Sequence, residues 1–299
     1  MPPEASPAFV TRRTALGGAL ALASAGAALA APNGAVAAIE RRVGGRVGLA
    51  AIDSTGRARI AYRADERFPM CSTFKALLAA AVLARVDARR ERLDRLIPYG
   101  KADLLDYAPA TTANLGKGGM SVSDLCAAAV EQSDNTAANL LLKTVGGPAG
   151  YTAFARRIGD RVTRLDRTEP ALNTALPDDP RDTTTPAAMA ESLRRVLLGP
   201  VLLPASRAQL TVWLTANQTG DRRLKAGLPA GWSIGDKTGT GDRGSTNDIA
   251  IIWTRQHNPV LVAAYLTGSA APRAELEAAL ADLGRLIANA FTPVPIGHG

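Results

Sequence analysis

Strand-like segments lie near the two ends of this chain, and helix-like segments fill the long stretch between them. The early strand pair is joined by the turn sequence Asp53-Ser54-Thr55-Gly56, which is a hairpin signal. The late strands follow one another with only turns between them, and strands joined in this way pair antiparallel. We therefore expect one antiparallel sheet built from both chain ends. Its strands are predicted at residues 47–52, 58–62, 232–237, 249–253 and 260–267.

The middle of the chain favours helix, because helix-forming residues dominate it and glycine and proline punctuate it. Two further helices, 35–42 and 272–291, flank the strands. These patterns predict an α+β fold, with terminal helices on the sheet and an all-α subdomain alongside. The central helices are predicted at residues 73–86, 122–132, 137–145, 149–158, 187–198 and 205–216.

Domain boundaries follow from this division. Residues 31–71 and 229–299 are expected to form an α/β subdomain, and residues 72–228 an all-α subdomain. Within the latter, residues 161–185 carry three prolines and no periodic segment. So long a connection inside a compact domain is usually functional. We expect a compact Ω-type loop that packs on its own leucines, which are Leu165, Leu172 and Leu176.

The first 30 residues have the pattern of an export signal. Arg12-Arg13 precedes an uncharged run rich in alanine, glycine and leucine that ends in Ala28-Leu29-Ala30, an A-x-A cleavage pattern. The paired arginines suggest the twin-arginine route. We expect a periplasmic or secreted protein with no stable membrane insertion after cleavage, because the rest of the chain has no apolar stretch approaching about 20 residues.

Charge and histidine content narrow the chemistry. The formal net charge is +8, but basic residues are scattered and aromatic residues make up only 4% of the chain, so nucleic-acid binding is not expected. The two histidines are His257 and His298. A Ser-His-Asp triad or a zinc site therefore lacks raw material, and we expect no metal. Any serine chemistry must use lysine or a carboxylate as its base.

Ser72-Thr73-Phe74-Lys75 opens a run of strong helix formers. Ser72 is expected near a helix start, with Lys75 one turn on and on the same face. A serine there has a backbone N–H that the helix leaves unpaired, able to point at a developing oxyanion. An amine three residues later is in reach of the hydroxyl proton. By itself the pattern is weak, and a capping serine with a solvated lysine explains it better.

Three other short motifs change that balance. Ser133-Asp134-Asn135 lies where one predicted helix stops and another begins, and Asn135 or Thr136 suits the cap. Lys237-Thr238-Gly239 ends a predicted strand. By itself it is explained by an edge strand that lysine protects from pairing with another chain and that glycine loosens. Glu169-Pro170-Ala171-Leu172-Asn173 sits inside the long loop, where a lone glutamate is by default solvated.

Together the four motifs stand in the order found in the class A serine β-lactamases, which the chain resembles over roughly residues 35–290. The resemblance implies a β-lactam hydrolase that works through a covalent acyl-serine intermediate and confers β-lactam resistance. It implies an active site between the two subdomains, a small-molecule substrate, no cofactor and a monomer. The alternatives are a D-alanyl-D-alanine peptidase and a penicillin-binding sensor that does not hydrolyse.

Catalytic roles carry over by position. Ser72 resembles the nucleophile, and Lys75 and Glu169 are the two candidates for the acylation base. Ser133 resembles the hydroxyl that passes a proton to the departing ring nitrogen. Glu169 and Asn173 would hold the hydrolytic water.

Substrate-binding roles carry over in the same way. Lys237 and Thr238 of the Lys-Thr-Gly motif would gather the substrate carboxylate with Ser133, and the backbone N–H groups of Ser72 and Thr240 would form the oxyanion hole. The remaining expected substrate-binding residues are Asn135, Gly239, Tyr107 and Arg223. Tyr107 resembles the aromatic residue at the cleft mouth, although a core tyrosine is an equally good interpretation.

Some positions depart from the family pattern. Thr246 stands where many members have the arginine that binds the carboxylate, and Arg223 or Arg222 resembles the substitute arginine of another branch. Cys71 and Cys126 lack cysteines at their family partner positions, Gly241 and Ala79, so the resemblance implies two free thiols. Arg167 and Asp182 match the ion pair that closes the family's long loop.

Overall fold

The computed structural model describes residues 32–256 and 258–292. The predicted export signal, His257 and His298 lie outside the described residues. No helix within the described ranges combines the length and the hydropathy needed to cross a bilayer.

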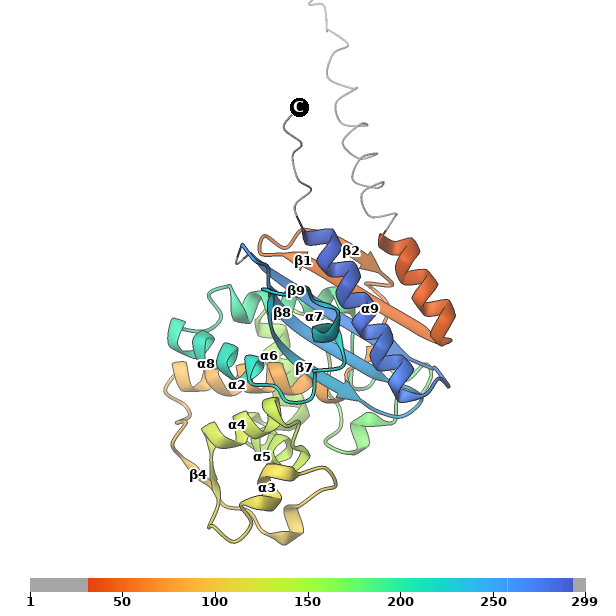
Figure 1. Cartoon of the computed structure of the whole chain (residues 1–299). Helices are drawn as coiled ribbons and strands as arrows, with labels where there is room; N and C mark the ends of the chain where they lie inside the picture. The colour runs from red at the N-terminus through yellow and green to blue at the C-terminus, as the bar shows by residue number, and fades with distance from the viewer. Residues whose placement is uncertain (1–31, 257, 293–299) are drawn as a thin grey trace, which may run out of the picture.

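One five-stranded sheet joins the two ends of the chain (Figure 1). Its strand order is β2-β1-β9-β8-β7, and each neighbouring pair is antiparallel. The first strand pairs with the last over its whole length, from Arg46 opposite Thr267 to Asp53 opposite Val260. The predicted antiparallel sheet is therefore confirmed. Its strands are β1 (Arg46–Asp53), β2 (Ala58–Tyr62), β7 (Ser233–Thr240), β8 (Thr246–Trp253) and β9 (Pro259–Thr267).

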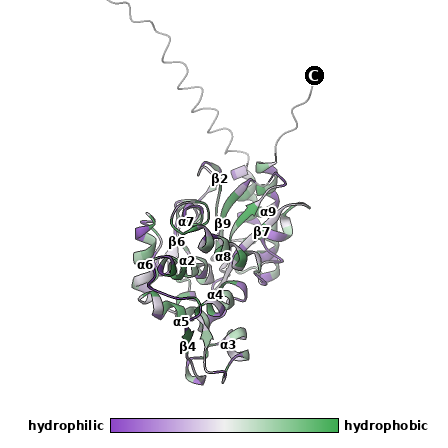
Figure 2. Cartoon of the chain, turned by 90° about the vertical axis from the view of Figure 1, so that its left-hand side faces the viewer, coloured by the Kyte–Doolittle hydropathy of each residue, from purple (hydrophilic) through white to green (hydrophobic). Residues whose placement is uncertain are grey.

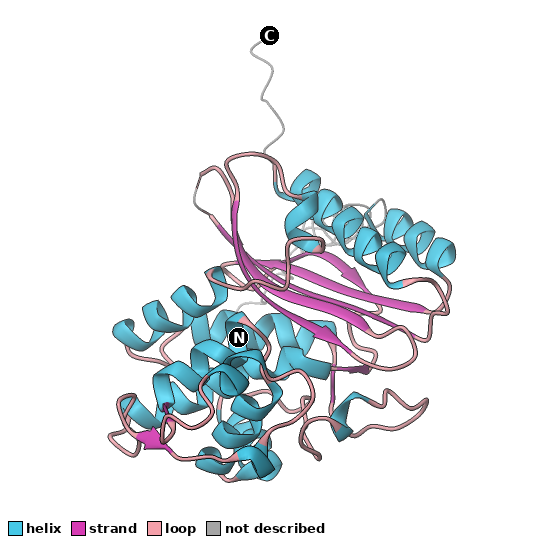
Figure 3. Ribbon diagram, turned by 60° about the horizontal axis from the view of Figure 1, so that its bottom comes forward, coloured by secondary structure: helices cyan, strands magenta, loops and turns pink. Residues whose placement is uncertain are grey.

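The sheet is buried on both faces. Along β8, Ile249 and Ile251 join one hydrophobic core and Ala250 and Ile252 join the other, as the two-residue repeat of a strand requires. A helix over residues 32–43 and α9 (Arg273–Phe291) cover one face (Figures 1 and 3). The predicted flanking by terminal helices holds for this face. The opposite face is covered by α7 (Pro186–Leu197) from the middle of the chain, which the sequence did not indicate.

The helical part is assembled around α2, whose first ten residues are buried. A helix that is apolar on all sides belongs at the centre of a core, and the hydropathy colouring of Figure 2 shows α2 among its neighbours. All the predicted central helices lie within two residues of their predicted bounds, and the short helix α3 was not predicted. The helices of this part are α2 (Phe74–Asp87), α3 (Pro109–Ala113), α4 (Val122–Glu131), α5 (Asn135–Val145), α6 (Gly147–Arg157) and α8 (Pro204–Thr215).

Several local predictions are wrong. The cap of α5 is Asp134, whose side chain accepts a hydrogen bond from the Ala137 N–H at 2.8 Å, and not Asn135 or Thr136. Because Asp134 accepts the hydrogen bond from the first turn of α5, the side chain of Asn135 is free to make other contacts. Strand β7 continues three residues beyond its predicted end at Lys237, since it pairs with β8 along its whole length.

The loop at residues 161–185 contains a 3₁₀ turn, Ala171–Asn173, and ends in the short strand β6 (Thr183–Thr184). Leu165 and Leu172 are buried as predicted, but Leu176 is 50% exposed and does not pack inward. Strand β6 pairs with β3 (Phe68–Pro69), which leads directly into the turn that carries Ser72. The loop is thus attached at its end to the segment before the predicted nucleophile.

Candidate active site

Ser72 lies in a 3₁₀ turn, Cys71–Thr73, that leads into α2. The turn is sharp, because Cys71 has a φ of 46°, a left-handed conformation uncommon for residues other than glycine. Asn247 of β8 holds the turn by donating from Nδ2 to the carbonyls of Pro69 and Met70 at 2.9 and 3.1 Å. The turn therefore fixes the Ser72 side chain relative to both the sheet and α2.

Three side chains converge on the carboxylate of Glu169. The Ser72 hydroxyl donates to Oε1 at 3.0 Å, and the Lys75 Nζ lies 3.0 Å from the same oxygen. Asn173 donates from Nδ2 to Oε2 at 2.6 Å. Glu169 is buried, so the default interpretation of a solvated loop glutamate is wrong. A serine hydroxyl, an amine and a carboxylate at these distances form an arrangement for nucleophilic catalysis.

Asn139 positions the backbone of Glu169. Its Nδ2 donates to the Glu169 carbonyl at 2.9 Å, and its Oδ1 accepts from the Glu169 N–H at 3.0 Å. This residue was not predicted from the sequence. The available signal was the spacing of Asn135 and Asn139, four residues apart and hence on one face of α5.

Lys75 is completely buried and has three acceptors. Besides approaching Glu169, its Nζ donates to the Ser133 carbonyl at 2.8 Å and to Asn135 Oδ1 at 2.6 Å. Burial lowers the pKa of Lys75, and the adjacent Glu169 carboxylate opposes that effect. Three acceptors match the three N–H bonds of an ammonium group, so this geometry holds Lys75 as a cation.

Lys237 is also completely buried, although it belongs to the edge strand β7. The interpretation of this lysine as edge protection is therefore wrong. Its Nζ donates to Ser133 Oγ at 3.0 Å and to the Thr238 carbonyl at 2.8 Å. Burial, followed by repulsion from Lys75, lowers the pKa of Lys237 well below its ordinary value. Because Ser133 Oγ accepts from Lys237, the hydroxyl hydrogen of Ser133 is free to be donated elsewhere.

A pair of buried carboxyl groups, Asp236 and Asp248, lies close to Lys237, and neither was predicted from the sequence. Burial raises the pKa of Asp236 to about 6, and burial together with Asp236 raises the pKa of Asp248 well above its ordinary value. Both carboxyl groups oppose the lowering of the Lys237 pKa.

Arg223, not Arg222, reaches the strand that carries the Lys-Thr-Gly motif. Its guanidinium donates to the Gly239 carbonyl at 2.9 Å and to Thr240 Oγ1 at 2.8 Å. Arg222 points to solvent, with 82% of its side chain exposed. Thr246 is buried on β8 opposite Thr240.

The rim of the site is formed by the segment before α3. Tyr107 is 62% exposed, which excludes the core interpretation of this tyrosine. Its carbonyl accepts from the Asn135 N–H at 3.1 Å, and Asn135 Nδ2 donates to the Asp106 carbonyl at 3.0 Å. Asn135 thus connects the exposed rim to the buried Lys75.

Two glycines let β7 approach the other elements of the site. A Cβ at Gly239 would lie 2.7 Å from the Met70 carbonyl oxygen, so glycine permits the strand to pass close to the Ser72 turn. A Cβ at Gly241 would lie 2.7 Å from both the Asn173 carbonyl oxygen and Cys71 Sγ. Cys71 and Cys126 are free and buried, and burial raises the pKa of both thiols.

We expect Gly241→Cys to form a disulfide with Cys71, because the new Cβ would stand beside the existing sulfur. The bridge should raise the free energy of unfolding by about 2–4 kcal/mol, less whatever is needed to displace the Asn173 carbonyl. Mass spectrometry after oxidation should show the loss of two hydrogens, and reduction should abolish the gain in melting temperature. Gly241→Ser is the matched control, and free thiols that persist under oxidising conditions would contradict the prediction.

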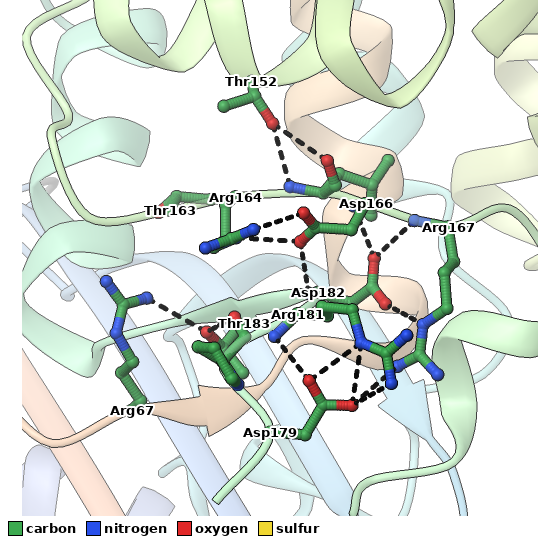
Figure 4. Close-up of polar contacts among 12 residues, drawn as sticks. Arg67, Thr152, Thr163, Arg164, Asp166, Arg167, Asp179, Arg181, Asp182 and Thr183 are labelled. Carbon is green, nitrogen blue, oxygen red and sulfur yellow. Dashed lines mark hydrogen bonds and ion pairs between the residues drawn. The ribbon is translucent and has the colours of Figure 1, made fainter.

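The neck of the loop at residues 161–185 is closed by a buried ion pair (Figure 4). Arg167 Nε donates to Asp182 Oδ2 at 2.5 Å, with 1% of the Asp182 side chain exposed. Asp182 Oδ1 also accepts from the N–H groups of Asp166 and Arg167 at 2.7 and 2.9 Å. The Met70 N–H donates to the Asp182 carbonyl at 2.9 Å, so the neck is continuous with the segment before Ser72.

Asp182→Asn is expected to destabilise this neck, because it removes the closer of the two counter-charges of the partly buried Arg167 guanidinium and leaves only Asp179, at 3.8 Å. Breaking one half of a buried pair costs about 3–5 kcal/mol, against about 0–1 kcal/mol for an exposed pair. Chemical denaturation should show this loss, and turnover should slow as Glu169 is displaced. Asp94→Asn, which breaks the exposed pair with Arg92, is the control. Unchanged kinetics and melting in Asp182→Asn would refute the clamp.

The comparisons with known proteins agree with this geometry. Residues 32–291 match the model of a family described as the β-lactamase enzyme family. β-Lactamase OXY-2 of Klebsiella oxytoca is 51% identical over 229 residues, covering 77% of this chain and 79% of the relative. β-Lactamase L2 of Stenotrophomonas maltophilia is 50% identical over 251 residues, covering 84% and 82%.

The solved structures that resemble this chain are also β-lactamases. The structure described as the last common ancestor of Gram-negative bacteria (GNCA4) class A β-lactamase has a TM-score of 0.86 and 62% identity. That match covers 88% of this chain and all of the ancestral one. Family match, identity and fold agree along nearly the whole described chain: it belongs to the class A β-lactamases.

Proposed function

We propose that the protein hydrolyses β-lactam antibiotics through a covalent acyl-enzyme on Ser72, and so confers β-lactam resistance. The observation that carries the proposal is the hydrogen bond of 3.0 Å from the Ser72 hydroxyl to Glu169, with Lys75 and Asn173 on the same carboxylate. A nucleophile, a base and a buried cation in one contact are what acyl transfer to serine requires. The relatives named β-lactamases support the substrate class.

In the first half-reaction Ser72 Oγ attacks the lactam carbonyl carbon and its proton passes to Glu169. The backbone N–H groups of Ser72 and Thr240 stabilise the oxyanion. The carbon–nitrogen bond then breaks, and the ring nitrogen takes a proton from Ser133, whose oxygen is held by Lys237. The proton on Glu169 returns to Ser133 by way of Lys75, which contacts Glu169 and the Ser133 carbonyl, so both groups are restored before the second half-reaction. Glu169 is preferred to Lys75 as the proton acceptor because Lys75 already donates to three acceptors.

In the second half-reaction water attacks the acyl carbon while Glu169 takes one of the water's protons, and Glu169 returns that proton to Ser72 Oγ as the ester bond breaks. The amide of Asn173 orients the Glu169 carboxylate for this step. Lys237, Thr238 and Ser133 gather the substrate carboxylate, with Arg223 supporting the strand through Gly239 and Thr240. Asn135 and Tyr107 meet the substrate's side chain at the rim.

We also propose the organisation that the sequence implies. Residues 31–71 and 229–299 form one subdomain and residues 72–228 the other, with the active site between them. The protein acts as a monomer, without metal or cofactor. Arg12-Arg13 and the Ala28-Leu29-Ala30 pattern support export, by the twin-arginine route, to the periplasm or medium.

The test is steady-state turnover of a chromogenic cephalosporin, followed by kinetics on a penicillin, an oxyimino-cephalosporin and a carbapenem. Continuous hydrolysis that is lost in Ser72→Ala is expected. A burst equal to the enzyme concentration with no further turnover would indicate a penicillin sensor instead. Release of D-alanine from a D-alanyl-D-alanine peptide, without β-lactam turnover, would indicate a peptidase.

A further inference from the structure

A cavity of about 520 Å³ opens away from Ser72, where the C-terminal end of α2 meets α6. Its floor is apolar, and the side chains that form it come from α2, α6 and the segments beside them. They are Ala81, Ala84, Val145, Phe154, Ile158 and Val201. Helix α2 has 14 residues and so extends about 21 Å at 1.5 Å per residue, which separates this cavity from the Ser72 turn at its other end.

Three arginines, Arg85, Arg90 and Arg157, form the polar wall of this cavity, and no acidic residue of the described chain lines it. The Arg157 guanidinium lies over the Phe154 ring, 5.6 Å from its centroid, which joins the polar wall to the apolar floor. Three like charges repel one another, and no carboxylate of the described residues lines the cavity with them, so the cavity is electrostatically complementary to an anion.

The nearby carboxylates are already engaged. Asp87 accepts from the Ser206 hydroxyl at 2.6 Å and from the Leu203 N–H at 2.8 Å, and Glu91 pairs with Arg95 at 2.6 Å. By contrast, the Nε of Arg85 is buried and has no hydrogen-bond partner among the described residues. Its Nη2 reaches only the Arg90 carbonyl, at 3.4 Å. The Arg85 guanidinium is thus held by one long hydrogen bond and forms no ion pair with a carboxylate of the described residues.

We propose that this cavity binds a single-chain amphiphilic carboxylate, a medium-chain fatty acid, at a site separate from the active site. The forked guanidinium of Arg85 matches a carboxylate, and Arg157 and Arg90 complete the charge. The alkyl chain lies along Ala84, Val145 and Val201, which the fold only partly covers and which a small inorganic anion would leave uncovered. The volume falls within the range of about 300–1,000 Å³ that is usual for small-molecule pockets. The proposal does not depend on the proposed catalytic activity.

Isothermal titration calorimetry with decanoate, below its micelle concentration, tests the site on the full protein. One binding site and a rise in melting temperature are expected. Arg85→Gln and Arg157→Gln should each weaken the affinity at least tenfold, since each removes one charged donor. Arg89→Gln is the matched control, because it makes the same charge change beside the cavity without lining it, and its affinity should equal that of the unaltered protein.

Ligand analogues separate the two parts of the site. Acetate, which has the charge without the chain, and decyltrimethylammonium, which has the chain with the opposite charge, should both fail to bind. Absence of decanoate binding would overturn the proposal. So would equal affinity in Arg85→Gln and Arg157→Gln, or binding of the cationic analogue at the same site. Because Arg157 is exposed and its replacement leaves the core intact, loss of binding in that variant does not reflect unfolding.

Discussion

Glu169→Ala is expected to turn the enzyme into a trap that is acylated by a β-lactam and released only slowly. The substitution removes the carboxylate that contacts Ser72 and, through Asn173, would orient the water of the second step. Loss of a positioned general base typically costs about 10²–10⁴-fold in rate. The first step is assisted by the strain of the four-membered lactam ring, and the second acts on an unstrained ester, so the second step should suffer more.

Mass spectrometry of the intact protein measures this directly, as a mass gain equal to one substrate molecule that persists for minutes to hours. Glu169→Gln should behave similarly while preserving the side-chain shape beside Lys75. Asp178→Ala, which removes an exposed carboxylate from the same loop, should turn over normally. Full turnover in Glu169→Ala, with no accumulated adduct, would remove Glu169 from its proposed role.

The long strands and helices could be predicted because each repeats a pattern over many residues. The two-residue strands β3 and β6 have no period to detect, and they form because Phe68 meets Thr184 across the chain. The end of β7 was missed for a related reason. Thr238, Gly239 and Thr240 do not resemble an apolar strand, and only pairing with β8 makes them part of one.

The chemistry-bearing residues of the site could be named from the sequence because the motifs resemble those of a known family. Their supports could not, because support depends on contacts between distant segments. Asn139 acts on Glu169 across 30 residues of chain. The burial of Lys237 depends on Ser133 from the helical part and on the carboxyl pair at Asp236 and Asp248 close to it. An exposed edge lysine and a buried active-site lysine have the same local sequence.

Lys75 is a second buried charge in the site, and its replacement is expected to have a large effect on the acylation rate. We expect Lys75→Met, which keeps the length of the side chain and removes its charge, to slow acylation about 10²–10³-fold, the usual cost of losing one electrostatic stabiliser. Lys75 Nζ holds Glu169, the Ser133 carbonyl and Asn135 Oδ1 in one arrangement. Single-turnover stopped-flow measurements on a chromogenic cephalosporin give the acylation rate without the later step.

The comparison of Lys75→Met with Glu169→Gln decides which group removes the proton from Ser72. If Glu169 is the acceptor, Glu169→Gln slows acylation, and Lys75→Met keeps a residual acylation that the added Glu169→Gln change abolishes. If Lys75 is the acceptor, Glu169→Gln acylates at the full rate and Lys75→Met loses the pH dependence of a base. Lys75→Arg should not restore the rate, because the planar guanidinium does not fit a completely buried position shaped for an ammonium. Melting temperatures of the three variants separate lost chemistry from lost stability. Lys75→Met leaves Glu169 buried without its partner, and Glu169→Gln leaves Lys75 buried without its partner.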